Sequence, residues 1–316
     1  LAQMPSGEWH GYFFNPGDEG DTKCKEKGVK LKFDGNNARG GGENTFGEFS
    51  LKGSYDASTK TFTLKATQTV PATPGQDASQ KKAVLMPIRV GLLDKSTGKD
   101  IEIASVNGVA QEKGTTTAVL RFDQKEQTFM FENVEQDVVP SILRNFSAPI
   151  KMTTDLEEGD LLFLMANDSD PFNRWEAGQT LFRSLLVKLI ADETNGKALE
   201  MNTKITDALR KTIEGAKAAD ADKAFIARAM MVPSESELVE MLEPGTVDPD
   251  VVKAARKFVM KSLAADLRPL LEETAKANSA PAYKNEPADR AMRSLKNTCL
   301  GYLSYVDAPE VAKDAL

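Results

Sequence analysis

Residues 139–150 read VPSILRNFSAPI and residues 167–176 read NDSDPFNRWE, and the stretch that includes both decides the fold. Before it, apolar residues alternate with a period of two, as in half-buried strands. From Phe172 onward they recur with the three-to-four-residue spacing of helices. Residues 139–181 are therefore predicted to be the junction between a part built of strands and a part built of helices.

Residues 55–153 are predicted to form a β-sandwich, because short alternating runs are separated by turn residues. Residues 46–53 and 61–67 alternate on either side of a polar turn, which predicts a hairpin. Pro87 lies inside another apolar run and predicts an edge position or a bulge, since proline cannot donate a ladder hydrogen bond. Further strands are predicted at residues 84–93, 116–122 and 127–131.

The first 54 residues are rich in glycine and contain aromatic, strand-like runs, which predicts a small antiparallel β-barrel or meander. Two explanations of the aromatic residues remain open: a plain hydrophobic core, which is the more ordinary one, or the lining of a ligand pocket. The residues of this pocket hypothesis are Trp9, Tyr12, Phe33 and Phe49. His10, beside Trp9 in a predicted strand, is expected to be structural.

Residues 154–316 are predicted to form a helical array. Asp170 followed by Pro171 has the pattern of a helix N-cap and first helical residue. Ser234 with Glu237 three residues later has the pattern of a capping box. The chain ends without the polar capping element that such arrays need, so the array is expected to be incomplete.

Two further segments of this part carry expectations of their own. Pro269 falls inside the apolar stripe of a long helix and predicts a kink or a break there. The acidic residues Asp155, Glu157, Glu158 and Asp160 stand close together before the first expected helix. They are predicted to form a solvated linker, because nothing around them suggests the burial that catalytic carboxylates require.

Composition excludes several functional classes. The net charge is −7 over 316 residues, with basic residues scattered among acidic ones, which argues against a nucleic-acid partner. No apolar run approaches the roughly 20 residues of a membrane span, so no membrane partner is expected. The single histidine is too few for the two-histidine zinc motif H-E-x-x-H. Cys24 and Cys299 lie far apart and are expected to be free thiols in a reducing compartment.

The first residues, LAQMPS, have neither a basic region nor an apolar core, so a signal peptide is not expected there. The expected location is the cytoplasm, or an organelle if a targeting segment has been removed.

From about residue 55 onward the sequence resembles the C-terminal half of bacterial-type aminopeptidase N, the alanyl aminopeptidase family of zinc metallopeptidases. Matching blocks occur in the family's order through both the strand and the helical parts. These blocks are Thr73-Pro74-Gly75-Gln76, Met86-Pro87-Ile88 with Gly91-Leu92-Leu93, Gln127-Thr128-Phe129-Met130-Phe131, Pro140-Ser141-Ile142-Leu143-Arg144, Phe146-Ser147-Ala148-Pro149, Phe172-Asn173-Arg174-Trp175-Glu176, Pro233-Ser234-Glu235, Asp248-Pro249 and Cys299-Leu300.

The resemblance implies an immunoglobulin-like β-sandwich followed by an α-helical superhelix that covers an active site. It also implies that zinc, the cofactor of the family, and its ligands belong to a preceding catalytic domain. No catalytic or metal-binding residue is therefore assigned to this chain, and no cofactor is expected in it. Arg144 and Arg174 lie in matching blocks and are expected either to line a substrate channel or, more ordinarily, to form ion pairs at the domain junction.

The resemblance does not cover residues 1–54, and two explanations remain for residues 46–52. These residues either supply the sandwich with a substitute first strand or belong to a separate fused module. Two functions follow. The chain is a non-catalytic scaffold or lid whose partner is a peptidase catalytic domain or a peptide, or an inactive derivative. Alternatively, it binds a small ligand or a protein through the N-terminal module or the concave face of the helices.

Overall fold

The computed structural model describes residues 7–10, 30–34, 37–41, 48–242, 248–279 and 283–306, with side chains from Phe49 onward except that of Lys151. It divides into two units. The first comprises residues 1–48 and 69–82, and the second comprises residues 49–68 and 83–316. Each unit is described by itself.

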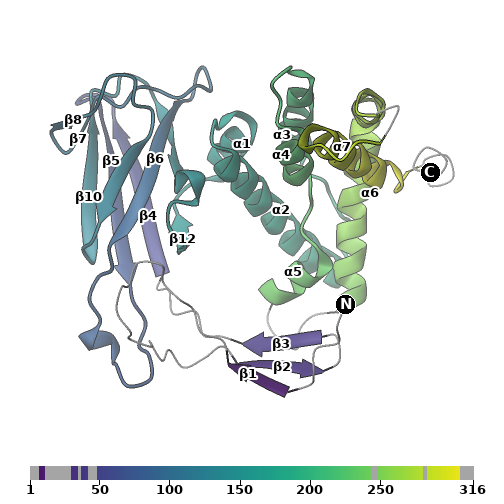
Figure 1. The fold of residues 1–316 in the computed structure, drawn as a ribbon, viewed down its shortest axis with the longest axis horizontal. Coiled ribbons are helices and arrows are strands. Elements are labelled where there is room, and N and C mark those ends of the chain that lie inside the picture. The colour runs from purple at the N-terminus through teal and green to yellow at the C-terminus, as the bar shows by residue number, and fades with distance from the viewer. Residues whose placement is uncertain are drawn as a thin grey trace. The chain divides into compact units, whose positions relative to one another are not determined.

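The first unit contains a three-stranded antiparallel sheet in the order β1-β2-β3. The strands are β1 (Gly7–His10), β2 (Lys30–Asp34) and β3 (Asn37–Gly41) (Figure 1). A short 3-10 helix, η1 (Ala78–Gln80), belongs to the same unit. The prediction of a small antiparallel module of strands is confirmed for these backbone segments, and Tyr12 and Cys24 lie outside the described residues.

The second unit begins with a β-sandwich of two sheets, as predicted. One sheet has the strand order β12-β4-β5-β10-β7-β8, and the other has the order β11-β6-β9 (Figure 1). The strands are β4 (Glu48–Asp56), β5 (Thr61–Thr69), β6 (Met86–Asp94), β7 (Ser105–Val106), β8 (Val109–Ala110), β9 (Ala118–Phe122), β10 (Glu126–Glu132), β11 (Val138–Ile142) and β12 (Lys151–Thr154).

Alternating apolar residues of the two sheets face each other and form the sandwich core. On β5, buried and more exposed residues alternate, so Phe62, Leu64 and Ala66 point inward. Phe49 of β4 is 1% exposed, and its ring meets that of Phe122 edge to face at 6.5 Å. Strand β4 is therefore the first strand of the sandwich in sequence order, and its described side chains do not belong to a separate N-terminal module.

Strand β6 is the middle strand of its sheet, so the expectation of an edge position for Pro87 is wrong for the strand as a whole. The physical reason is local. Strand β11 pairs with β6 only from Val90 to Asp94, whereas β9 pairs with it from Met86 to Val90. At Pro87 only β9 is paired with β6. The missing N–H of Pro87 therefore removes no backbone hydrogen bond on the side of β6 where β11 pairs further along.

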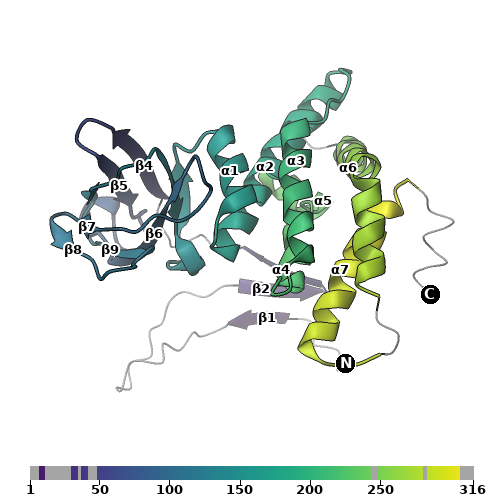
Figure 2. The same ribbon diagram turned by 90° about the horizontal axis from the view of Figure 1, so that it is seen from above.

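The helical part contains α1 to α7 and a 3-10 turn, η3 (Gly215–Lys217). The helices are α1 (Glu158–Asn167), α2 (Pro171–Thr194), α3 (Thr203–Glu214), α4 (Lys223–Ala229), α5 (Glu235–Met241), α6 (Pro249–Ala277) and α7 (Pro287–Leu303). Helix α1 packs against α2 and α3, and α6 packs against α2 and α7 (Figure 2). The predicted change from strands to helices is confirmed.

Helix α1 corrects the prediction that the acidic run is only a linker. Glu157 is its N-cap residue, and Glu158 and Asp160 lie in its first turn. Negative side chains are favourable at this end of a helix because the first backbone N–H groups carry a partial positive charge. The carboxylate of Asp155, just before the helix, accepts a hydrogen bond from the backbone N–H of Gly53 at 3.1 Å.

Two helix starts are confirmed. Asp170 caps α2 with Pro171 in the first turn, and Ser234 with Glu237 forms the capping box of α5. The expectation of a break at Pro269 is wrong, because α6 continues from Pro249 to Ala277 through it. Helix α6 is buried along one side by its neighbours, and this packing outweighs the hydrogen bond that the proline removes.

The helical core extends onto the sandwich. Leu93 of β6 and Val139 of β11 are buried in the same cluster as the helical residues. Val138 and Ile142, whose side chains point to the opposite face of β11, belong to the sandwich core. Every residue of β11 is buried, because one face is covered by the opposite sheet and the other by helices. The predicted junction is thus a packed interface.

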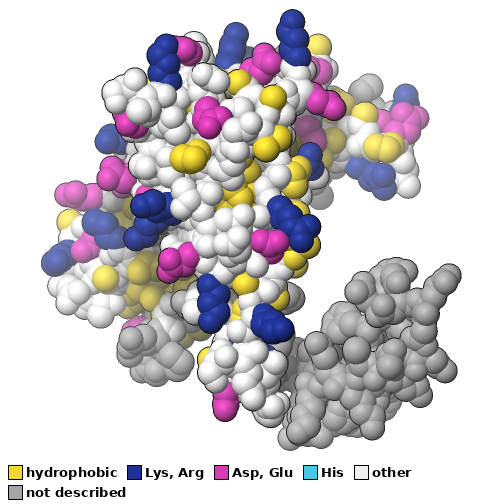
Figure 3. Space-filling view, turned by 90° about the vertical axis from the view of Figure 1, so that its left-hand side faces the viewer, with side chains coloured by type: hydrophobic (Ala, Val, Ile, Leu, Met, Phe, Trp, Pro, Cys, Tyr) yellow, Lys and Arg dark blue, Asp and Glu magenta, His cyan; other side chains and the backbone are white. Residues whose placement is uncertain are grey.

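Charged side chains of both signs are interspersed on the side of the molecule that Figure 3 shows. Among helices within the described residues, none combines the length and the apolar content that crossing a membrane requires.

Candidate functional site at the junction of sandwich and helices

Arg144 is the central residue of the junction. It follows β11 in a short 3-10 helix, η2 (Arg144–Phe146), and is only 4% exposed. Leu143, Asn145 and Phe146 around it have φ angles of 63°, 56° and 47°. Residues other than glycine rarely adopt such left-handed conformations, and each costs about 1–3 kcal/mol unless the surroundings enforce it. The contacts of Arg144 supply that enforcement.

The guanidinium of Arg144 joins segments from both halves of the unit. It donates to both carboxylate oxygens of Asp100, at 2.6 and 3.2 Å, which is the bidentate geometry of strong charge-assisted pairs. It also pairs with Asp168, which follows α1, at 3.3 Å. Its Nε donates to Ser141 Oγ at 2.9 Å, and Nη1 donates to Thr117 Oγ1 at 3.0 Å. Together these contacts tie the sandwich to the start of the helices.

Asp168 is the most buried acid of this cluster, at 2% exposure. Burial raises the pKa of its carboxyl above the usual value, although Ser141, the N–H of Asp170 and the charge of Arg144 each act to lower it. Its Oδ1 accepts from the N–H of Asp170 at 2.9 Å, and Oδ2 has no hydrogen-bond partner among the described residues.

Arg174 lies on the helical side of the same cluster. Burial lowers the pKa of its guanidinium, and the charge of Asp168 opposes that change. The guanidinium lies over the ring of Phe225 at 5.2 Å, a cation–π arrangement. Its Nε is buried without a hydrogen-bond partner among the described residues. Arg174 is thus held between a buried carboxyl and an aromatic ring.

Two residues of the junction were missed at the sequence level. Asn173 of α2 donates from its amide to Ser141 Oγ at 2.7 Å and to the carbonyl of Ile142 at 2.9 Å. Gly91 of β6 leaves room for Arg144, since a Cβ there would stand 2.1 Å from the guanidinium carbon. Both residues fall in blocks shared with the resembling family, and that match was the only available signal.

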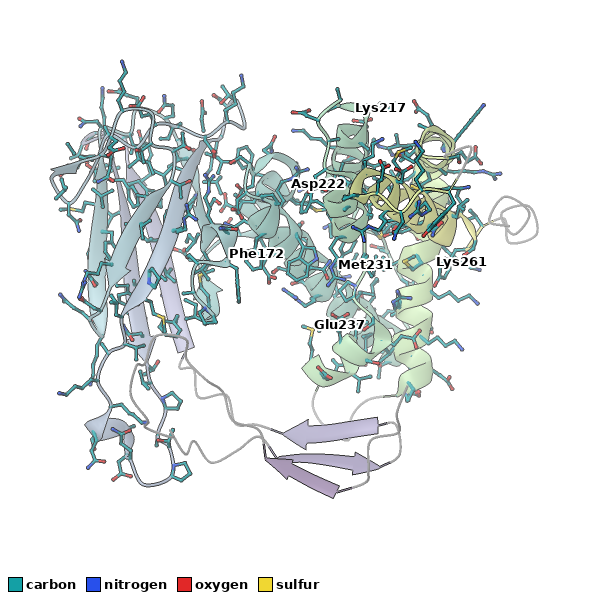
Figure 4. All side chains as sticks on the ribbon, viewed as in Figure 1. Phe172, Lys217, Asp222, Met231, Glu237 and Lys261 are labelled. Carbon is teal, nitrogen blue, oxygen red and sulfur yellow. The ribbon has the colours of Figure 1, made fainter. Side chains whose placement is uncertain are left out.

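Aromatic side chains continue the junction along α2. The rings of Phe146 and Phe172 are 5.0 Å apart, and those of Phe172 and Trp175 are 5.9 Å apart. The guanidinium of Arg228 lies over Trp175 at 5.6 Å. Phe172 is labelled on α2 in Figure 4. Phe146 remains 53% exposed, so the row is open to solvent at its sandwich end.

A cleft of about 310 Å³ opens beside Arg144 on the outer face of the sheet β11-β6-β9. Its walls come from β6, from the segment around Thr116 and Thr117, from η2 and from the start of α2. The charged side chains that line it are Arg89, Asp100, Arg144 and Asp170. It is the place where the sandwich and the helical part jointly expose polar groups.

The carboxylate of Asp170 both caps α2 and holds η2. Its Oδ1 accepts from the N–H of Asn173 at 2.9 Å, and its Oδ2 accepts from the N–H of Asn145 at 2.8 Å. Replacing Asp170 with alanine is expected to lower the free energy of unfolding by about 1–2 kcal/mol, since a helix cap is lost. Urea denaturation measures this change. Asp170→Asn is the comparison variant, because its single acceptor oxygen can still cap α2 but cannot also accept from Asn145; its loss is expected to be smaller than that of Asp170→Ala. An equal loss in both variants would contradict the capping role.

The structure brings two of the six residues singled out by sequence together: Arg144 and Arg174 both lie close to Asp168. Phe49 is buried in the sandwich core, where it is not available to a pocket of the N-terminal module. The side chains of Trp9, Tyr12 and Phe33 lie outside those that the structure describes. Cys299 is a free thiol, and burial raises its pKa to about 12.

Zinc, which the resemblance implies for the family, does not fit the described part of this chain. Within it, no three His, Cys, Asp or Glu side chains stand together in a way that could hold a metal ion. The single histidine, His10, has no described side chain. No residue is therefore assigned to zinc.

Two protein-family models match this chain, and the boundary between them falls where the sandwich ends and the helices begin. Residues 48–155 match a domain of unknown function, DUF3458, described as having an Ig-like fold. Residues 158–316 match the domain of unknown function DUF3458_C, described as ARM repeats. The Ig-like sandwich followed by helices is thus the fold that the sequence predicted.

Similar proteins are bacterial aminopeptidases. The chain is 31% identical to aminopeptidase N of Escherichia coli over 258 residues, which is 81% of this chain and 28% of that protein. It is 29% identical to aminopeptidase N of Haemophilus influenzae over 82% of this chain and 28% of that protein. The crystal structure of Legionella pneumophila aminopeptidase A in complex with aspartic acid matches with a TM-score of 0.65 and 26% identity, over 85% of this chain and 29% of that one.

The chain therefore spans less than a third of the length of these relatives, and the matched part comprises the Ig-like sandwich and the helical array. From the family models and these relatives together we conclude that the chain belongs to the family of proteins with DUF3458 and DUF3458_C domains, and that these Ig-like and ARM-repeat domains are homologous to the corresponding part of bacterial aminopeptidase N.

Proposed function

We propose that this chain is the scaffold and lid portion of an aminopeptidase and has no peptidase activity of its own. The observation that carries the proposal is the junction around Arg144. Two ion pairs and the amide of Asn173 attach the sandwich to the first helices through buried polar contacts. A domain that supports a neighbouring domain needs such firm attachment. An active centre would instead need side chains that bind a metal or act as acid, base or nucleophile.

In this proposal the partner is a peptidase catalytic domain. That domain would hold the zinc ion and hydrolyse N-terminal residues from peptides with a zinc-activated water. The present chain would position the helical array against it and limit access to it. A cytoplasmic location stays a prediction.

A peptidase assay tests the proposal on the chain as it stands. The purified protein is expected to release no fluorophore from an alanine amide substrate, with or without added zinc. Its zinc content after dialysis is expected to be well below one ion per chain. The same purification from cells that carry an empty vector controls for host aminopeptidases. Turnover that co-elutes with the protein and exceeds this control would overturn the proposal.

A further inference from the structure

The cleft beside Arg144 contains one arginine that the junction does not use. Arg89 of β6 lies on the same face of the strand as Gly91 and Leu93, because side chains alternate along a strand. Leu93 is covered by the helical core and Gly91 by Arg144. Arg89, the next residue in this row, is half-buried and lines the cleft.

The side chain of Arg89 has no hydrogen bond or ion pair to any residue that the structure describes, and its Nε is shielded from solvent. A guanidinium presents five N–H donors and stays charged at every physiological pH. Buried donors without an acceptor are rare in folded proteins, and each one calls for an explanation such as a bound ion. Arg89 therefore lacks an acceptor that a ligand could supply.

The acids of the cleft are already engaged. Asp100 accepts two hydrogen bonds from Arg144 and one from Ser169 at 2.5 Å. Asp170 accepts the N–H groups of Asn145 and Asn173. Neither carboxylate forms an ion pair with Arg89, so among the described residues the guanidinium of Arg89 has no carboxylate partner of its own.

We propose that this cleft is a binding site for a carboxylate group, with Arg89 as its anchor. The planar fork of a guanidinium matches the two oxygens of a carboxylate. The hydroxyl of Thr117 accepts from Arg144, so its own proton is free to donate to a ligand oxygen. The cleft volume of about 310 Å³ is at the lower end of small-molecule sites, which suits a single residue.

The two acids select the charge of the ligand. Asp100 and Asp170 stand at the walls of the cleft, and a doubly charged phosphate would be repelled by both. A singly charged carboxylate is repelled less than a doubly charged phosphate, and it can pair with the guanidinium of Arg89, which has no carboxylate partner among the described residues. The ligand class is therefore a monocarboxylate, either a free N-acylated amino acid or the C-terminal residue of a short peptide. The inference stands independently of the proposed scaffold function.

Ligand-observed NMR with the full chain tests the site. The probes are N-acetylglycine, its neutral partner N-acetylglycinamide, an acetylated tripeptide with a free C-terminus, and inorganic phosphate. The acid is expected to bind in the millimolar range and the amide much more weakly, because only the acid pairs with Arg89. Equal binding of acid and amide, or stronger binding of phosphate than of acid, would overturn the proposal. Binding of the tripeptide acid would identify a peptide end as the natural source, and its failure beside a bound N-acetylglycine would identify a free acid.

Variants locate the site. Arg89→Gln is expected to weaken binding of the acid about tenfold or more, the effect of losing a hydrogen-bonded charge. Arg89→Lys, which keeps the charge and loses the fork, is expected to lie between Arg89→Gln and the unchanged chain. Arg121→Gln is the matched control, since Arg121 pairs with Asp123 on the exposed surface and should change binding less than about twofold. The midpoint of urea denaturation checks that the Arg89→Gln variant is folded. Unchanged binding of the acid in that folded variant would exclude Arg89 as the anchor.

Discussion

Replacing Arg144 with alanine is expected to lower the free energy of unfolding by about 3–5 kcal/mol. The guanidinium is the partner of Asp100 and of Asp168, and both carboxylates are largely shielded from solvent. Removing one member of a buried ion pair leaves the other without compensation, and the protein pays the desolvation of that charge in full. The left-handed backbone of η2 also loses the contact that holds it.

Urea denaturation at neutral pH measures this loss. Lys217→Ala is the matched control, because Lys217 and Glu273 form an ion pair in which both side chains are more than half exposed. Exposed pairs contribute about 0–1 kcal/mol, so the control is expected to stay close to the unchanged chain. A loss for Arg144→Ala no larger than that of Lys217→Ala would contradict the role of Arg144 as the centre of the junction.

The same variant is expected to depend on pH in a defined direction. Burial already raises the pKa of Asp168, and removing Arg144 removes an effect that lowers it. A carboxyl whose pKa is higher in the folded state stabilises the fold fully below its unfolded pKa, and that stability is lost as pH rises through the folded pKa. The difference between Arg144→Ala and the unchanged chain should therefore shrink as the pH is lowered from 7, because the raised pKa of Asp168 lets this carboxyl take up its proton at a higher pH than an ordinary aspartate.

Local signals in the sequence were sufficient for much of the architecture. The Asp170–Pro171 pair and the Ser234–Glu237 box predicted helix starts because the capping interactions involve residues within one turn. The alternation in residues 61–67 predicted β5 because each inward residue is buried by the opposite sheet. In such cases the physical cause of the structure lies within the segment itself.

The partners of Arg144 could not be predicted in this way. Asp100, Thr117 and Asp168 come from separate segments, and nothing in their spacing indicates that they meet at Arg144. The block around Arg144 that resembles the aminopeptidase family marked the position, and two roles for Arg144 stayed open. Only the folded chain shows which carboxylates it faces.

Two errors at the sequence level have related causes. The acidic run was interpreted by its charge alone, although Leu161, Leu162 and Phe163 follow it and pack against the helical core. Phe49 was grouped with the aromatic residues nearest in sequence, whereas its neighbours in space are Phe122 and the rest of the sandwich core. For the acidic run and for Phe49 alike, contacts with residues far away in the sequence determine which part of the structure the segment joins.

Replacing Gly91 with alanine is expected to lower the free energy of unfolding almost as much as Arg144→Ala, by about 3–5 kcal/mol. The new methyl group would stand 2.1 Å from the guanidinium carbon of Arg144, far inside van der Waals contact. The guanidinium must then leave its place against β6, and its pairs with Asp100 and Asp168 are lost with it. Gly178→Ala in α2 is the matched control, because its added methyl meets Met165 at an ordinary 3.6 Å. There the helix should gain up to about 1 kcal/mol.

A double-mutant cycle separates this mechanism from a general intolerance of β6 for a side chain. In the Arg144→Ala background the obstacle is absent, and Gly91→Ala is expected to be neutral or to stabilise by up to about 1 kcal/mol, since alanine restricts the unfolded chain. The two changes should therefore be strongly non-additive, with a coupling energy of at least about 2 kcal/mol. If instead the losses add, the methyl group acts on the strand and not on Arg144, and the fit of Gly91 to the guanidinium is not what holds the junction together.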